Sequence, residues 1–363
     1  MIAFVPEDRR GRRVLFTPGP LTTTRTVRDA LRDDIGSWDN DCIALVSRIR
    51  TSLVDIAGGR DDLTCTPFQG SGSYAVEAVL GSAVPRDGGL LILVNGAYGQ
   101  RMVYIAEALG LPHRVMRDPE YRPHDPAALD KTLAEDPEIT HVACVHCETT
   151  TGLLNPIREL GLVVDKHRRR YIIDTISSFG AYPIAEADHI TGTANKCIEG
   201  VPGFAFVISR RAAVEAAAGN ARSLSLDLHG QWAHLEKTGQ FRFTPPTHVL
   251  LAFEQALVEF QAEGGVEARA ARYRDNHRVL NDGMTRLGFS PFIAPEHQSH
   301  IITAYRFPTD EFDFRSFYDR LRGQGFIIYP GKVTDADTFR IGNIGSIDRR
   351  EIEALLAAIE RVM

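Results

Sequence analysis

The sequence of 363 residues has few cysteines and no long hydrophobic run. Its five cysteines, an odd number without the spacing of a disulfide framework, suit a reducing compartment. The longest apolar stretches, such as residues 90–94, are far too short to cross a bilayer. Residues 1–13 carry basic side chains but no long apolar run before a cleavage site, so they do not resemble a secretory signal. We therefore expect a cytoplasmic protein without a membrane partner.

The sequence also lacks an excess of basic charge. Its formal net charge of −6 excludes the basic surface by which proteins bind nucleic acids. The hydrophobic share of 44% and the charged share of 24% are those of an ordinary globular protein. The chain is long for one hydrophobic core and sufficient for two domains. Small molecules are therefore the partners that we expect.

From about residue 60, glycine-punctuated apolar runs alternate with helical patterns. This rhythm is typical of an α/β domain with a mainly parallel sheet. Polar residues follow the ends of successive strands, where ligands bind in open α/β sheets. Strands are predicted within residues 89–99, 139–152, 168–180 and 190–209, and helices over 73–84 and 101–109.

The pattern changes from about Pro245. A long helix is predicted over residues 247–287, and the last residues, 348–363, carry apolar side chains at helical spacing. Between these helices we predict strands in HIITAYRF (300–307), GFIIYP (325–330) and TFRIGNIG (338–345), with a helix around 314–323. We interpret residues 1–255 as a large domain, whose N-terminal segment packs on the small domain or on a dimer partner. Residues 256–363 are then a smaller α/β domain.

The segment QGSGSYAVEA (69–78) has the features of a phosphate-binding cup. Gly70 and Gly72 permit a tight backbone, and the amides of residues 71–73 would point from a helix N-terminus toward an anion. The segment also resembles a dinucleotide motif, but that motif needs an acidic residue after the next strand, which here ends in Asn95. A phosphate cup is favoured, although a glycine turn without a ligand is an alternative for this motif alone.

Three further residues follow strand ends. Tyr98 could stack on a flat ring or simply pack in the core. Asp174 could keep a pyridine nitrogen protonated, or serve only as a helix or loop cap. Lys196 lies between small residues before a glycine-rich loop, and burial near a cationic ring would lower its pKa and make it nucleophilic. The cup, the aromatic ring, the carboxylate and the lysine, in this order, predict a pyridoxal 5'-phosphate (PLP) enzyme with Lys196 as its Schiff-base lysine.

Two patterns resemble metal sites. Cys144 and Cys147 resemble half a zinc site, but positions three apart in a strand point to opposite faces. His146 and Glu148 match the H-x-E of zinc deaminases, but the downstream P-C-x-x-C is absent. We therefore expect no metal site, and we interpret Cys197 as a small packing residue.

Distinctive motifs occur along nearly the whole sequence: FTPGPLTTT (16–24), WDND (38–41), QGSGSYAVEAVLGSAVP (69–85), NGAYGQRM (95–102), HCETTTGLLNP (146–156), IIDTISSFG (172–180), ANKCIEGVPGFAFVIS (194–209), RSLSLDLHGQW (222–232), FTPPTH (243–248), YPGKV (329–333) and FRIGNIG (339–345). In these motifs, the sequence resembles the class V aminotransferases of fold-type I. Within them, it is most similar to the transaminases that act on 2-aminoethylphosphonate and pyruvate. The stretches around Lys196 and ETTTG (148–152) are more specific to these transaminases than to class V enzymes in general.

The resemblance implies roles for four residues around the cofactor ring. Lys196 would bind PLP covalently, and Asp174 would pair with the pyridinium nitrogen. Tyr98 would stack on the ring, and Thr149 would contact its phenolic side.

The resemblance also implies two anion sites. Ser71, Gly72 and Ser73 would hold the cofactor phosphate, joined by Thr244 from a neighbouring subunit. Arg340 would bind the acidic end of the substrate, because a guanidinium fork suits a carboxylate or a phosphonate. Enzymes of this family are homodimers with sites at the subunit interface, which makes a homodimer the expected assembly.

The implied activity, a step of phosphonate degradation, converts 2-aminoethylphosphonate and pyruvate into phosphonoacetaldehyde and L-alanine by ping-pong chemistry. Freed Lys196 would move a proton from the substrate carbon to the cofactor carbon. Alternatives are a related class V aminotransferase that uses serine or alanine with glyoxylate, a class V lyase or desulfurase, and a PLP-binding protein without catalysis.

One segment departs from the family pattern. Residues 180–193, GAYPIAEADHITGT, are a few residues fewer than the family usually has. A deletion within a buried strand shifts the register and turns side chains to the other face. Either a loop absorbs the loss, or Lys196 is misplaced and activity is impaired.

Overall fold

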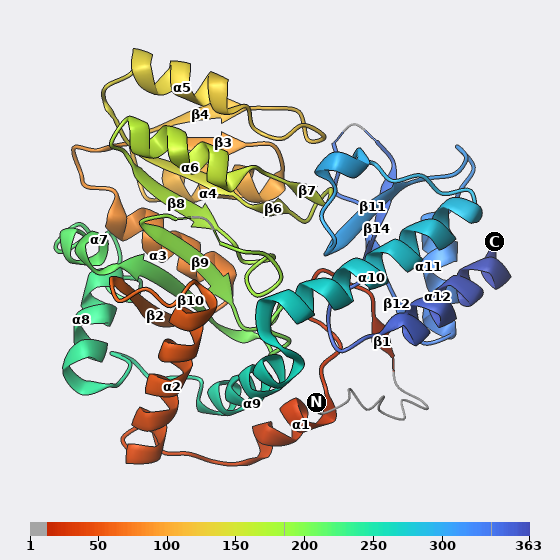
Figure 1. The fold of residues 1–363 in the computed structure, drawn as a ribbon, viewed down its shortest axis with the longest axis horizontal. Helices are drawn as coiled ribbons and strands as arrows, with labels where there is room; N and C mark the ends of the chain where they lie inside the picture. Colours follow the sequence, from red (N-terminus) through yellow and green to blue (C-terminus); the bar gives the residue numbers. More distant parts are fainter. Residues whose placement is uncertain (1–12, 185, 335) are drawn as a thin grey trace.

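The computed structural model describes residues 13–184, 186–334 and 336–363 (Figure 1). The residues from which we predicted the absence of a secretory signal lie, apart from Arg13, outside this range. A seven-stranded sheet forms the centre, in the order β2-β10-β9-β8-β5-β3-β4. All neighbouring strands are parallel except β10, which is antiparallel to both β2 and β9. The strands are β2 (Leu63–Gly70), β3 (Gly89–Val94), β4 (His113–Arg117), β5 (Ile139–Val145), β8 (Arg170–Asp174), β9 (His189–Thr193) and β10 (Gly203–Arg210). The predicted α/β fold with a mainly parallel sheet is confirmed.

Helices cover both faces of this sheet, which explains why its central strands are apolar throughout. Strand β3, for example, is buried at all six positions. In β3, β5, β8 and β10, alternate residues enter the two separate apolar cores that the two layers of helices form with the sheet. One face packs against α3 (Gly72–Ala83), α4 (Ala97–Ala108) and α7 (Arg211–Ala216), and the other against α2 (Asn40–Ile56), α5 (Pro126–Glu135), α6 (Ile157–Lys166) and α9 (Thr247–Glu263). Helix α8 (Leu228–Thr238) contributes Leu228 to the first core and Leu235 to the second.

Two helix boundaries differ from the sequence prediction. Helix α4, predicted from residue 101, begins at Ala97, because the Glu148 carboxylate accepts hydrogen bonds from amides in its first turn. The single helix predicted over residues 247–287 is wrong. The chain forms α9 and then α10 (Gly265–Arg286), separated at Gly264, whose φ of 115° ends the first helix.

The C-terminal part has a smaller sheet, in the order β11-β14-β13. Helix α10 runs from the large sheet toward this region (Figure 1). Near the start of the chain, β1 pairs in parallel with β12, so the described N-terminal segment packs beside the C-terminal elements. Residue 255 lies within α9, and the division into two domains there stays a prediction. The elements are β11 (Ile302–Arg306), α11 (Phe314–Gly323), β12 (Phe326–Ile327), β13 (Tyr329–Pro330), β14 (Thr338–Gly342), α12 (Arg349–Val362) and, at the N-terminus, β1 (Val14–Leu15) and α1 (Arg25–Asp29).

Short elements complete the fold. A two-stranded hairpin of β6 (Cys147–Glu148) and β7 (Leu153–Leu154) follows β5, and two 3-10 turns cover Ala30–Arg32 and Pro295–His297. In the described part of the chain, no helix combines the length and the hydropathy that a membrane span requires.

Candidate active site

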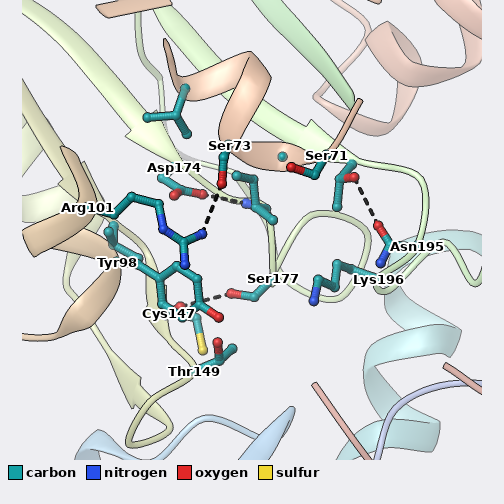
Figure 2. A pocket seen from close by; sticks show the side chains of 15 residues that line it. Ser71, Ser73, Tyr98, Arg101, Cys147, Thr149, Asp174, Ser177, Asn195 and Lys196 are labelled. Carbon is teal, nitrogen blue, oxygen red and sulfur yellow. Dashed lines mark hydrogen bonds between the residues drawn. The ribbon is translucent and has the colours of Figure 1, made fainter. Parts of the chain in front are cut away.

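A pocket lies at the C-terminal ends of β5 and β8, next to the starts of α3 and α4 (Figure 2). Tyr98 and Arg101 approach it from one side, and Lys196 approaches it from the opposite side. Seven of the nine predicted site residues line it: Ser71, Gly72, Ser73, Tyr98, Thr149, Asp174 and Lys196. These residues converge because the carboxyl ends of parallel strands meet at one edge of the sheet.

The predicted phosphate cup is the N-terminus of α3. The side chain of Ser71, the N-cap residue, forms no capping hydrogen bond, so this helix end faces the pocket without a side-chain cap. Gly72 allows α3 to approach the loop after β8, since a Cβ there would lie 2.6 Å from Ile176 Cδ1. A helix N-terminus attracts anions, so this end of the pocket suits a phosphate.

Arg101 also lines the pocket, and sequence analysis missed it. Its Nη1 donates a hydrogen bond to Ser73 Oγ at 3.0 Å, and its guanidinium carbon lies 4.8 Å from the centre of the Tyr98 ring. The signal in the sequence is its place three residues after Tyr98, which puts both side chains on one face of α4. Arg101 therefore adds a positive charge beside the cup.

Asp174 ends β8 and is 6% exposed. Its Oδ1 accepts a hydrogen bond from the Ile176 amide at 2.8 Å. Burial raises the pKa of its carboxyl to about 6, although the Ile176 amide and the charges of Arg101 and Lys196 act in the opposite direction. A cation that entered the pocket beside Asp174 would keep this carboxylate ionised.

Lys196 enters the pocket from the loop between β9 and β10. Its Nζ donates a hydrogen bond to the carbonyl of Pro18 at 2.6 Å. Burial, aided by the charges of Arg340 and Arg101, lowers the pKa of the amine to about 8, against opposing effects of Cys197 and Asp174. A large fraction of the amine is therefore neutral in mildly alkaline solution, as a nucleophile requires.

Strand β9, which precedes Lys196, is paired on both sides. It pairs with β8 at Asp174↔Thr191 and with β10 at Ala205↔Thr193. The shortening of residues 180–193 relative to the family stays a prediction, and residue 185 lies outside the described residues. Of the two outcomes considered above, the geometry agrees with a loop that absorbs the loss.

Two predicted residues lie outside the pocket lining. Arg340, on β14, is 2% exposed and donates hydrogen bonds to the carbonyls of Thr149 at 2.8 Å and Pro330 at 3.0 Å. Thr244 is exposed, and its carbonyl accepts a hydrogen bond from Gln69 Nε2 at 2.7 Å. Arg340 is thus joined to the pocket through Thr149, whereas the role of Thr244 in a neighbouring subunit stays a prediction.

The residues that resemble metal ligands have other contacts. Glu148 accepts hydrogen bonds from the amides of Gly99 at 2.7 Å and Tyr98 at 3.2 Å, and burial raises its pKa to about 7. Sequence analysis missed this role of Glu148 at the start of α4. Cys144 and Cys147 lie in different apolar cores. Within residues 13–184, 186–334 and 336–363, no three His, Cys, Asp or Glu side chains gather as metal ligands would.

Comparisons with known proteins agree with this geometry. The model of the family "Aminotransferase class-V" matches residues 39–339. The chain is 46% identical over 355 residues, 96% of both chains, to the 2-aminoethylphosphonate–pyruvate transaminase of Pseudomonas putida KT2440. It is 50% identical over 357 residues to the enzyme of that name from Klebsiella pneumoniae, covering 96% of this chain and 97% of that one.

Solved structures share the fold. The ureidoglycine-glyoxylate aminotransferase of Bacillus subtilis has a TM-score of 0.88 at 22% identity. The pyridoxamine-pyruvate aminotransferase of Mesorhizobium loti has a TM-score of 0.88 at 24% identity. Each alignment covers 99% of this chain and 93% of the other. The resemblance seen in the sequence is confirmed, and the chain belongs to the class V aminotransferases.

Proposed function

We propose that this protein transfers the amino group of 2-aminoethylphosphonate to pyruvate, with PLP as its cofactor. The observation that carries the proposal is the pocket in which Lys196 and Asp174 face the open N-terminus of α3. Curated relatives that are 46–50% identical over about 96% of the chain are named for this reaction. The products would be phosphonoacetaldehyde and L-alanine.

The residues of the pocket fit PLP. This cofactor carries an aldehyde for an amine, a ring nitrogen for a carboxylate, an aromatic plane and a phosphate. Lys196, Asp174, Tyr98 and the α3 N-terminus supply the matching groups. When bound, PLP withdraws electrons from the substrate carbon through its protonated ring. Asp174 would hold the proton on the ring nitrogen.

Lys196 would act first as the covalent anchor and then as the proton carrier. With a pKa near 8, its amine can accept a proton at one carbon and release it at another. The Pro18 carbonyl gives the free amine a hydrogen-bond acceptor 2.6 Å away. This acceptor would hold the released amine at its present place in the pocket.

Arg340 would bind the anionic end of each substrate in turn. Its hydrogen bonds go to the neutral carbonyls of Thr149 and Pro330, so neither of these partners neutralises its positive charge. A buried guanidinium in this state attracts a phosphonate or a carboxylate strongly. One such site would serve both the amine donor and pyruvate, because the two substrates bind in turn in ping-pong chemistry.

We further propose a homodimer in the cytoplasm. Thr244 is exposed and lies outside the pocket of its own chain, which is the position expected of a residue that reaches a partner's cofactor phosphate. Size-exclusion chromatography with light scattering tests the assembly, and a monomer that is fully active would contradict it.

An absorbance scan of the purified PLP-loaded protein tests the activity. Adding 2-aminoethylphosphonate is expected to replace the band of the lysine-bound cofactor with that of pyridoxamine phosphate, and pyruvate is expected to restore it while L-alanine forms. A panel with serine or alanine and glyoxylate tests the related aminotransferase activity. The proposal fails if 2-aminoethylphosphonate leaves the spectrum unchanged, or if Lys196→Ala retains the wild-type band.

A further inference from the structure

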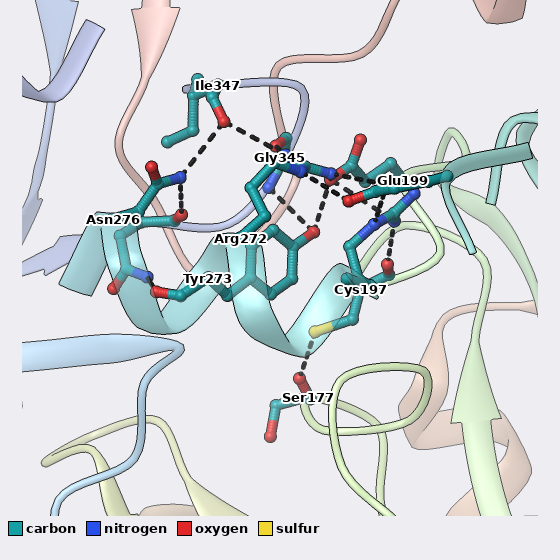
Figure 3. A network of polar contacts seen from close by, with 11 residues as sticks. Ser177, Cys197, Glu199, Arg272, Tyr273, Asn276, Gly345 and Ile347 are labelled. Carbon is teal, nitrogen blue, oxygen red and sulfur yellow. Dashed lines mark hydrogen bonds and ion pairs between the residues drawn. The ribbon is translucent and has the colours of Figure 1, made fainter. Parts of the chain in front are cut away.

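A network of largely buried charged side chains contacts the loop that carries Lys196, outside the pocket lining (Figure 3). It joins the loop between β9 and β10 to helix α10. Two carboxylates balance two guanidinium groups, and a tyrosine hydroxyl completes the network. Its members are Glu199, Glu263, Arg269, Arg272 and Tyr273.

The backbone of Glu199 shapes the loop that carries the lysine. Its φ is 65°. Among the described non-glycine residues, only Arg168, with a φ of 54°, also has a positive φ. Its amide donates to the Lys196 carbonyl at 2.7 Å, and the Gly200 amide donates to the Ala194 carbonyl at 3.0 Å. Because glutamate disfavours this left-handed conformation, the surroundings must hold it in place.

The carboxylate of Glu199 supplies that hold. Its Oε1 accepts hydrogen bonds from Tyr273 Oη at 2.5 Å and from Arg272 Nη2 at 2.8 Å, and Arg269 Nη1 lies 3.4 Å away. All three donors belong to α10. Arg269 also donates to the carbonyl of Cys197, the residue next to Lys196.

Arg272 and Tyr273 also contact the segment that follows β14, the strand of Arg340. Arg272 Nη1 donates to the carbonyls of Gly345 at 2.7 Å and Ile347 at 3.1 Å. The Gly345 amide donates to Tyr273 Oη at 3.2 Å. The network therefore connects the loop of the pocket lysine with the segment next to the strand of the substrate arginine.

We propose that Glu199 is a positioning residue for Lys196. Its charge holds the loop over residues 194–200 in place. Through the side chains of α10, it also fixes the position of this loop relative to the segment after β14. The effect on catalysis rests on the proposed function of Lys196, whereas the effect on the loop itself does not.

Glu263 offers a matched control. It accepts hydrogen bonds from Arg269 Nε at 2.7 Å and from Arg272 Nε at 2.8 Å, so it shares both arginines with Glu199. Its hydrogen bonds do not reach the lysine loop. Glu199→Gln and Glu263→Gln each remove one negative charge from the same network and preserve the side-chain shape. Glu263 is the more exposed of the two, with 23% of its side chain accessible against 8% for Glu199.

Amide hydrogen exchange in the cofactor-free protein gives the first readout. Glu199→Gln is expected to speed exchange at residues 199 and 200 about tenfold or more, while Glu263→Gln leaves these amides near the wild-type rate. In the PLP-loaded protein, Glu199→Gln is expected to lower kcat about ten- to a hundredfold with smaller changes in KM, since small displacements of a reacting group have effects of this size.

Equal effects of the two variants on exchange and kcat would assign the network a general structural role and overturn the proposal. Wild-type exchange in Glu199→Gln would also overturn it. Should Glu199→Gln not fold, Tyr273→Phe removes one donor from the Glu199 carboxylate and must speed exchange at the same two amides. If the wild-type protein proved inactive on 2-aminoethylphosphonate, the exchange result would still decide the positioning role.

Discussion

Gly19 follows Pro18, whose carbonyl accepts the hydrogen bond of Lys196, and lies close against the lysine side chain. A Cβ at this position would lie 2.5 Å from Lys196 Nζ, 2.7 Å from Lys196 Cδ and 2.9 Å from the Asn195 carbonyl oxygen. Real Cβ atoms essentially never approach other atoms within 3.0 Å, so Gly19→Ala must displace the lysine or the loop around it. The φ of Gly19 is 118°, a conformation that alanine rarely adopts, so the substitution also strains the backbone.

The expected cost has two parts. A non-glycine residue in this part of conformational space costs about 1–3 kcal/mol, and overpacking costs about another 1–3 kcal/mol. We expect Gly19→Ala to lower the free energy of unfolding by about 2–6 kcal/mol. Because a displacement near 1 Å can cost about a hundredfold in rate, we expect kcat to fall by about that factor.

Gly58→Ala separates the cost of backbone strain from the cost of overpacking. Gly58 has a φ of 112°, and a Cβ there would meet nothing within 4 Å. This variant should show the backbone strain alone, about 1–3 kcal/mol, with kcat unchanged. Denaturant unfolding and steady-state turnover of 2-aminoethylphosphonate and pyruvate measure both quantities. If the two variants lose equal stability and Gly19→Ala keeps the wild-type kcat, the contact between Gly19 and Lys196 does not shape the site.

Three further predictions concern the pocket. Asp174→Asn should lower kcat about a hundred- to a thousandfold, because it removes the carboxylate proposed to pair with the ring nitrogen; steady-state kinetics at saturating PLP would refute this if kcat stayed within tenfold. Arg340→Met should raise KM for both substrates about thirtyfold or more, as expected when a buried charged partner of an anion is removed; a rise for only one substrate would contradict a shared site. The rate at which cofactor-free protein captures PLP should rise with pH around a midpoint near 8, since burial lowers the pKa of Lys196 and only its neutral amine reacts; a stopped-flow midpoint above 10 would contradict this.

Much of the pocket followed from the sequence because its residues come directly after strands. The sequence has five lysines, at positions 131, 166, 196, 237 and 332. Only Lys196 lies between a strand and a glycine-rich loop, and the other four are exposed. Residues at strand ends share one edge of a parallel sheet whatever the details of packing, which is why Asp174 and Tyr98 were also found.

Other features depend on contacts between distant residues. Glu148 caps α4 across fifty residues of chain, and neither its metal-like pattern nor its place in ETTTG (148–152) indicates this contact. Glu199 lies within three residues of the lysine, but its partners on α10 are seventy or more residues away. The break between α9 and α10 depends on the positive φ at Gly264, which apolar periodicity does not reveal.

The connection between β8 and β9 shows where evolution can change the length of this chain at little cost. Asp174 and Lys196 are anchored by strands on either side of it, and the pairing Asp174↔Thr191 fixes their separation whatever the number of residues between. We therefore expect insertions and deletions to be tolerated around Pro183, which is exposed to solvent. The catalytic centre and this surface loop can diverge independently, although they share one stretch of sequence.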